Sequence, residues 1–186
     1  MPFDEAYYRE VHVYDGNEKW YKDVALGVSD LTYGLQGRVL DVGCGRGYFM
    51  KEFLEMGKDV YGIDISDYAV SHPMPGCEGR IIKGDILDIP FKDNFFEWTI
   101  CYSVMEHIPE GDIPKALKEI ARVAPLSVMC IAILYSDDPG LREFYKHEDE
   151  THVTLKNLRW WVERFQEAHL RLEWSNDKMV VVLKRY

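Results

Sequence analysis

The stretch Val39-Leu40-Asp41-Val42-Gly43-Cys44-Gly45-Arg46-Gly47-Tyr48 decides the fold class. Its apolar beginning, with Arg38 before it, is typical of a short buried strand that ends at glycines. A helical pattern follows at once, because Phe49, Phe53 and Met56 recur at i, i+4 and i+7 and so lie on one face. Glycines between a strand and a helix let a ligand approach the backbone closely, so this stretch predicts a binding loop.

Strand-like and helix-like segments alternate from this point to the end of the chain. Helices are expected after Ser66, after Asp112 and after Thr154, each of which can cap a helix. Repeated strand–helix units imply right-handed crossovers and a parallel sheet covered on both faces. The predicted fold class is therefore α/β: a doubly wound, three-layer sandwich with a seven-stranded, mostly parallel sheet and a C-terminal antiparallel strand. After 38–42, the expected strands are 59–63, 80–83, 95–101, 127–134, 170–174 and 179–183.

Charge and cysteine usage limit the possible partners. The net charge of −10, from 22 basic and 32 acidic residues, disfavours nucleic acid, since such binding usually relies on Lys and Arg. We find no apolar run long enough to cross a bilayer, and the acidic start does not resemble a signal peptide, so we expect a cytoplasmic protein without a membrane partner. The four cysteines are far apart and lack histidines at metal-ligand spacing, which predicts free thiols and no metal site.

The glycine spacing distinguishes this loop from a dinucleotide fingerprint. A G-x-G-x-x-G motif needs glycine or alanine at its sixth place, where this chain has the bulky Tyr48. The pattern Asp-x-Gly-x-Gly-x-Gly, from Asp41 to Gly47, instead resembles the first motif of the class I, Rossmann-fold S-adenosylmethionine-dependent methyltransferases. Three later segments also match that family and its small-molecule group: 61–66, 84–87, and the run 89–97 with Glu106-His107. The chain departs from the group's pattern at Glu97, 125–127 and 168–170. These differences weaken any inference of its substrate from the substrates of the group.

The resemblance implies S-adenosyl-L-methionine as the cofactor and S-adenosyl-L-homocysteine as its product. A carboxylate at the end of the second strand can accept both ribose hydroxyls, and Asp64 stands there. The family places an acid or amide beside the adenine amino group, a role that falls to Asp85 with Ile86. Asp41 either contacts the ligand or holds the glycine loop by hydrogen bonds. The expected cofactor-binding residues are Asp41, Gly43, Cys44, Gly45, Gly47, Asp64, Ile65, Asp85, Ile86, Cys101 and Tyr102.

We expect one methyltransferase domain over residues 1–186. Its parts are an N-terminal helical lid or cap (1–36), a cofactor-binding core (37–135), and a substrate-side loop with the last helix and a hairpin (136–186). The N-terminal part is rich in aromatic residues. These either form a lid, where rings can hold a sulfonium by cation–π attraction, or pack a helix onto the sheet. They are Tyr7, Tyr8, Tyr14, Trp20 and Tyr21.

The resemblance also constrains the chemistry. Methyl transfer from a sulfonium is an in-line displacement, so the protein mainly positions the acceptor and excludes water. A phenol, hydroxyl or acidic carbon also needs a base, for which the catalytic candidates are His152 and His107. Each has a simpler interpretation: His152 as a solvated histidine of the long polar loop 136–152, and His107, beside Glu106, as a half-buried imidazole near a helix start. Cys101 lacks the preceding proline of cysteine-using cytosine methylases, which favours a core thiol.

Three functions fit these observations. The first is methyl transfer to an unidentified small-molecule acceptor, which the acidic charge favours. The second is a protein or RNA methyltransferase of the same fold, and the third is a non-catalytic protein that binds the cofactor or a partner. We expect a monomer or a homodimer. The sequence leaves open the acceptor and the atom that is methylated.

Overall fold

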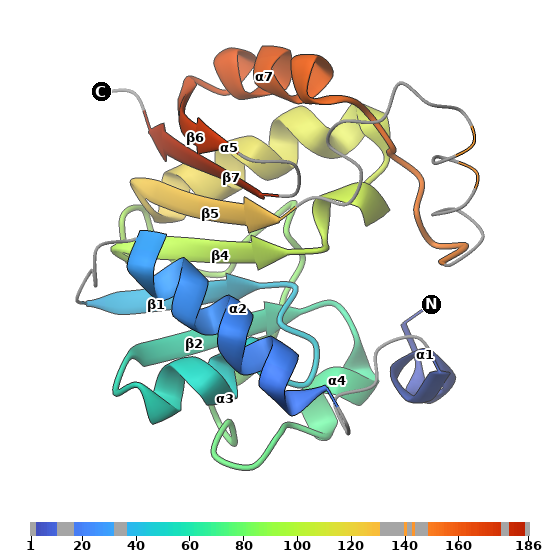
Figure 1. Cartoon of the computed structure of the whole chain (residues 1–186), viewed down its shortest axis with the longest axis vertical. Coiled ribbons are helices and arrows are strands. Elements are labelled where there is room, and N and C mark those ends of the chain that lie inside the picture. The colour runs from blue at the N-terminus through green and yellow to red at the C-terminus, as the bar shows by residue number, and fades with distance from the viewer. Residues whose placement is uncertain are drawn as a thin grey trace.

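One twisted sheet forms the centre of the computed structural model, which describes residues 3–10, 17–31, 37–130, 149–175 and 179–184, together with 140 and 143 (Figure 1). Its strand order is β3-β2-β1-β4-β5-β7-β6. The strands are β1 (Arg38–Val42), β2 (Asp59–Asp64), β3 (Ile81–Lys83), β4 (Trp98–Tyr102), β5 (Leu126–Cys130), β6 (Leu170–Ser175) and β7 (Met179–Lys184).

The first five strands form the parallel sheet that the sequence predicts, so the α/β class is confirmed. β7 pairs antiparallel with β5 on one side and with β6 on the other. In the centre, Asp41 of β1 is in register with Gly62 of β2 and with Ile100 of β4. The chain order therefore reverses between β1 and β4, and ligands of doubly wound sheets bind at the carboxyl ends of strands at such a point.

Helices cover both faces of this sheet (Figure 1). One core layer joins α2, α3 and α4 to the sheet and includes Ala25, Phe53 and Trp98. The other joins α5 and α7 to the opposite face and includes Leu117 and Trp161. The helices are α1 (Glu5–Glu10), α2 (Glu18–Leu31), α3 (Tyr48–Glu55), α4 (Asp67–Ser71), α5 (Ile113–Val123) and α7 (Leu158–Glu167), with short 3-10 turns η1 (Met105–His107) and η2 (Glu110–Asp112).

Two elements begin three residues later than predicted, and the other strand ends that can be compared within the described residues differ by at most one residue. The last helix begins at Leu158 rather than after Thr154, because Asn157 caps it by accepting a hydrogen bond from Trp160 N at 3.0 Å. The Thr154 hydroxyl instead donates to Ile108 O at 2.7 Å. The fourth strand begins at Trp98 rather than at residue 95, because the backbone before it turns away to pair with the end of α5.

Parts of the N-terminal and substrate-side segments lie outside the described residues, including Tyr14 and most of the loop 136–152. In the portion of the chain that is described, we find no helix with the length and apolar character that crossing a membrane requires.

Candidate functional site

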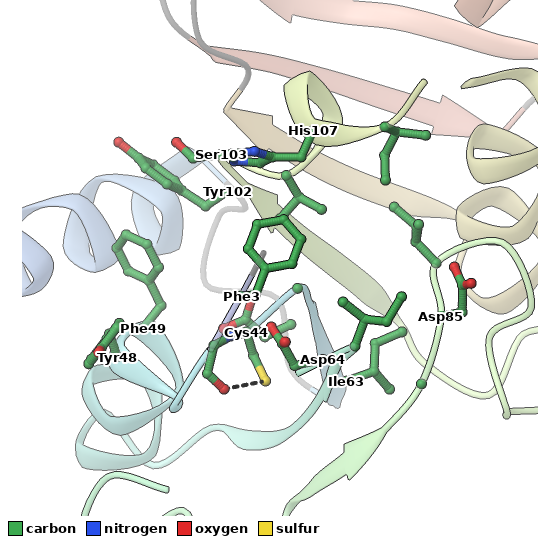
Figure 2. Close-up of a pocket in the computed structure, with 18 of the residues that line it drawn as sticks. Phe3, Cys44, Tyr48, Phe49, Ile63, Asp64, Asp85, Tyr102, Ser103 and His107 are labelled. Carbon is green, nitrogen blue, oxygen red and sulfur yellow. Dashed lines mark hydrogen bonds between the residues drawn. The ribbon is translucent and has the colours of Figure 1, made fainter. Parts of the chain in front are cut away.

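A cavity of about 330 Å³ opens at the carboxyl ends of β1, β2 and β4. Figure 2 shows side chains from these strand ends pointing into it. Its walls also include the loop after β3, η1 and the two N-terminal helices. Nine of the predicted cofactor-binding residues line it: Asp41, Gly43, Cys44, Gly45, Asp64, Ile65, Asp85, Ile86 and Tyr102.

The glycine loop is built so that its backbone forms the floor of this cavity. Gly43 and Gly45 have φ values of 71° and 54°, a region that favours glycine. Gly43 N donates to Ile63 O at 2.9 Å, which ties the loop to β2. A Cβ atom on Gly43 would lie 2.4 Å from Val104 Cγ2, so a side chain cannot be added there without displacing a neighbour. The loop therefore depends on glycine for both its conformation and its close packing.

Gly47 and Cys101 have other surroundings. Gly47 lies at the start of α3 with φ 93°, and a Cβ there would come within 3.0 Å of Cys77 Sγ. Cys101 is fully buried in the core beside α5 and α7. Neither residue is among those that line the cavity. Cys44, Cys77 and Cys101 are buried thiols that form no disulfide, as the sequence predicts for them.

Asp64 ends β2 and points into the cavity (Figure 2). Its Oδ2 accepts from Gly45 N at 2.7 Å, and its Oδ1 accepts from Ser66 N at 2.8 Å. The side chain is buried, and burial raises its pKa, while these hydrogen bonds and one from Tyr8 oppose the rise. Each carboxylate oxygen has two lone pairs, so Oδ2 retains one for a further donor such as a sugar hydroxyl. Oδ1 can take another donor if the long contact from Tyr8, at 3.5 Å, is replaced.

Asp41 lies beside Asp64 at the switch point of the sheet. It is buried, and burial, together with the charge of Asp64, raises its pKa to about 8. Its Oδ2 has no hydrogen-bond partner among the described residues, although the residue lines the cavity. Two adjacent acids of this kind can accept hydrogen bonds at the cavity floor, and Asp41, which holds its proton at neutral pH, can also donate one.

The loop after β3 forms the far wall. Gly84, Asp85, Ile86 and Leu87 all line the cavity. Asp85 Oδ1 accepts from Leu87 N at 2.8 Å, an interaction that fixes the side chain at the loop's start. An apolar slot next to an oriented carboxylate can hold a flat base with an exocyclic amino group.

Aromatic side chains of α1 and α2 cover the opening. Tyr7, Tyr8, Trp20 and Tyr21 line the cavity, and Phe3, which the sequence reasoning missed, joins them. Tyr21 also belongs to the core between α2 and the sheet. These residues border the cavity, and Tyr21 also packs onto the sheet; a lid over the methionine end stays a prediction.

His107 lines the cavity on the side opposite Asp64, and Phe3 lies between them in Figure 2. Its Nδ1 lies 2.8 Å from Thr151 Oγ1. The Thr151 hydroxyl donates to Asp149 Oδ1 at 2.5 Å, and Tyr7 donates from α1 to Asp149 Oδ2 at 3.1 Å. Burial raises the pKa of Asp149, but the bonds from Thr151 and the nearby histidines outweigh this effect and hold the pKa below its usual value.

His152 lies behind His107 rather than on the cavity wall. Their ring centroids are 4.8 Å apart, and His152 Nε2 is 3.9 Å from Asp149 Oδ2. Together with the buried Glu106, the two histidines offer ligand atoms that all lie within 4.8 Å of one another, a spacing compatible with a metal ion.

Comparison with known proteins identifies the family. Residues 40–126 match a family model described as a methyltransferase domain. The crystal structure of the YcgJ protein from Bacillus subtilis superposes with a TM-score of 0.66 at 26% identity, covering 81% of this chain and 70% of that one. Residues 40–126 therefore form a methyltransferase domain of the class I, S-adenosylmethionine-dependent type.

The chain spans about two thirds or less of the length of the two curated relatives described next. An uncharacterized methyltransferase of Bacillus subtilis, YcgJ, is 27% identical over 88% of this chain and 67% of its own length. A malonyl-[acyl-carrier protein] O-methyltransferase of Pectobacterium atrosepticum is 33% identical over 54% of this chain and 39% of its own. The crystal structure of the PH0226 protein of Pyrococcus horikoshii superposes with a TM-score of 0.74 at 21% identity. The superposition covers 97% of this chain and 99% of that one, and it supports the fold alone.

The cavity of this methyltransferase fits the family's cofactor. Its floor is a glycine cradle that side chains would fill, and an acid stands at the end of β2. The sequence reasoning missed Thr151 and Asp149 as site residues, although the run Asp149-Glu150-Thr151-His152 beside a candidate base was a signal of polar chemistry. Tyr145 and His147 of the same loop lie outside the described residues.

Proposed function

We propose that this chain catalyses transfer of a methyl group from S-adenosylmethionine to a small-molecule acceptor. The observation that carries the proposal is the position of Asp64, whose carboxylate is fixed by Gly45 N and Ser66 N at the edge of the glycine cradle. A rigid acid can accept the ribose hydroxyls of the adenosine, and the glycine loop beside it leaves room for the chain attached to that ribose.

The donor's parts map onto separate walls of the cavity. Asp64 would accept the ribose hydroxyls, Asp85 and Ile86 would border the adenine, and the loop of Gly43 and Gly45 would take the methionine end. When bound, the cofactor supplies a methyl group already activated by its sulfonium charge. The Asp64 carboxylate of the cavity floor complements the cationic groups of such a ligand.

The residues of the chain then position the reactants and exclude water from the reacting atoms. Phe3, Tyr7 and Tyr8 of the N-terminal segment cover the cavity, and Trp20 borders it from α2. Aromatic faces attract a sulfonium and exclude water from the reacting atoms. An aromatic cover of this kind suits a compact acceptor, and the net charge of −10 disfavours a nucleic acid. His107, which lines the cavity with His152 behind it, is the candidate base for an acceptor that must lose a proton.

Calorimetry with S-adenosylmethionine and S-adenosylhomocysteine tests this function. We expect wild-type protein to bind both, and Asp64→Ala to weaken binding by about one to two orders of magnitude, the cost of a lost bidentate charged contact. Asp59→Ala is the matched control, because Asp59 begins the same strand and is exposed at its other end. The absence of binding to wild-type protein, or equal affinity in Asp64→Ala, would refute the proposal.

A further inference from the structure

We propose that Thr151 and Asp149 are positioning residues that hold His107 in the tautomer with hydrogen on Nδ1, so that Nε2 is the base for an acceptor hydroxyl. The inference rests on the proposed function and deepens it, because it assigns the acceptor class. An alcohol, phenol or enol must lose a proton during methylation, whereas a neutral amine reacts through its own lone pair.

The tautomer follows from counting hydrogens. A threonine hydroxyl has one hydrogen and two lone pairs. Thr151 commits its hydrogen to Asp149 Oδ1 at 2.5 Å, since a carboxylate can only accept. Toward His107 Nδ1, 2.8 Å away, the Thr151 oxygen can therefore only accept. In the neutral ring this places the hydrogen on Nδ1 and the basic lone pair on Nε2.

The geometry of Asp149 keeps this arrangement in place. Thr151 N also donates to Asp149 Oδ1, at 2.9 Å, so the acid and the hydroxyl belong to one tight turn. The opposite oxygen accepts from Tyr7 at 3.1 Å. Both carboxylate oxygens thus have fixed donors in an environment that is buried, and the side chain cannot rotate without losing one of them.

Charge balance supports the role of a base. When Nε2 takes the proton, the ring becomes cationic, and Asp149 lies one hydroxyl away through Thr151. The other titratable groups that face the ring are Glu106 of η1, His152 and Tyr7. A buried carboxylate next to a forming imidazolium stabilises it, as in catalytic triads.

The proton and electron pairs balance in one displacement. The acceptor O–H bond breaks, its proton passes to His107 Nε2, and its electron pair forms the new O–CH₃ bond. The pair of the broken S–C bond stays on sulfur, which becomes a neutral thioether. The imidazolium then releases its proton to solvent, so no oxidant or further reactant is needed.

The N-terminal helix completes this side of the cavity. Tyr7 reaches Asp149 across 142 positions of sequence, and the edge of Phe3 packs on the His107 ring with centroids 5.5 Å apart at 88°. Both contacts come from the segment that covers the cavity. The base is therefore oriented by the same residues that shield the reacting atoms from water.

Nitrogen-15 NMR of the histidine rings tests the tautomer without any substrate. In full-length protein at a pH where the ring is neutral, His107, assigned by its loss in His107→Gln, should show a protonated Nδ1 and an unprotonated Nε2. Thr151→Val, which keeps the shape but removes the hydroxyl, should shift the ring toward the Nε2–H form. Thr151→Ser should restore the wild-type pattern.

The wild-type spectrum decides the proposal even if Thr151→Val does not fold. An Nε2–H tautomer in wild-type protein would overturn it, as would an unchanged Nδ1–H tautomer in folded Thr151→Val. The spectrum is repeated after EDTA treatment, because a change at Nε2 on chelation would identify this atom as a metal ligand and also overturn it. S-adenosylhomocysteine affinity, measured on the same samples, reports separately on the proposed function.

Discussion

The Tyr8 hydroxyl lies 3.5 Å from Oδ1 of Asp64, whose carboxylate we assign to the ribose. Its neighbour Tyr7 donates to Asp149 on the acceptor side. Two consecutive side chains of one short helix therefore contact the acids at both ends of the cavity. The N-terminal helix is the element through which the donor and acceptor sides are connected.

The ring and the hydroxyl of Tyr8 should contribute differently to cofactor binding. A Cβ on Gly45 would lie 3.2 Å from Tyr8 Cε1, so the ring closely covers the glycine loop, whereas the hydroxyl contact is long. We predict that Tyr8→Phe keeps the affinity for S-adenosylhomocysteine within about threefold of wild type, while Tyr8→Ala loses about tenfold, roughly 1.4 kcal/mol. Calorimetry of both variants checks this. A larger loss in Tyr8→Phe than in Tyr8→Ala would assign the contribution to the hydroxyl.

Gly43→Ala should destabilise the fold more than the same replacement at a glycine where the added Cβ atom would meet no other atoms. Gly57 is the matched control, with φ 77° and open space where a Cβ atom would stand, so Gly57→Ala reports backbone strain of about 1–2 kcal/mol. Gly43→Ala adds the overlap with Val104 and should cost about 2 kcal/mol more. Urea unfolding measures both free energies. Equal losses would show that the loop yields to a methyl group.

The buried Asp41 should make stability depend on pH. Since its pKa is raised to about 8, the folded chain holds this proton where the unfolded chain has lost it. The contribution of protonated Asp41 to the stability of the fold is fully present below the pKa of about 4 that Asp41 has in the unfolded chain. It is lost as the pH rises through the folded pKa of about 8. The unfolding free energy of Asp41→Asn minus that of wild type should therefore increase from pH 5 to pH 7, with a slope approaching about 1.4 kcal/mol per pH unit. A difference that stays flat across this range would contradict the raised pKa.

Removing the cap of the last helix should separate the two possible cap residues. Asn157→Ala should lower the free energy of unfolding by about 1 kcal/mol through the lost bond to Trp160 N. Thr154→Ser retains the hydroxyl that donates to Ile108 O and should have a smaller effect. Thermal or urea unfolding measures both, and an Asn157→Ala variant as stable as wild type would contradict the assignment of the cap to Asn157.

Local sequence was sufficient to predict which residues meet at the glycine-loop side of the cavity. The glycine bend and Asp64 follow from strand–loop patterns, because adjacent parallel strands bring their carboxyl ends to one edge. Nine predicted residues meet in one cavity for this reason. Gly47 and Cys101 belong to the same motifs but do not line the cavity. Gly47 packs against Cys77, and Cys101 lies in the core layer beside α5 and α7. The position of a residue in a motif does not by itself show which way it faces.

The acceptor side depends on tertiary contacts that no local pattern contains. Tyr7 and Asp149 meet across most of the chain, and Phe3 reaches His107 from the N-terminus. The predicted start of the last helix was wrong because Thr154 and Asn157 can both cap a helix. The Thr154 hydroxyl donates to Ile108 O instead, and Asn157 is the cap. The early start of the fourth strand was wrong because Phe96 N pairs with Val123 O at the end of α5.

The most direct measurement is a crystal structure of the chain with S-adenosylhomocysteine. The central claim predicts both ribose hydroxyls on the Asp64 carboxylate, the base beside Asp85, and the sulfur on the side of the cavity that His107 borders. A ligand whose ribose makes no contact with Asp64, or that binds outside this cavity, would contradict it.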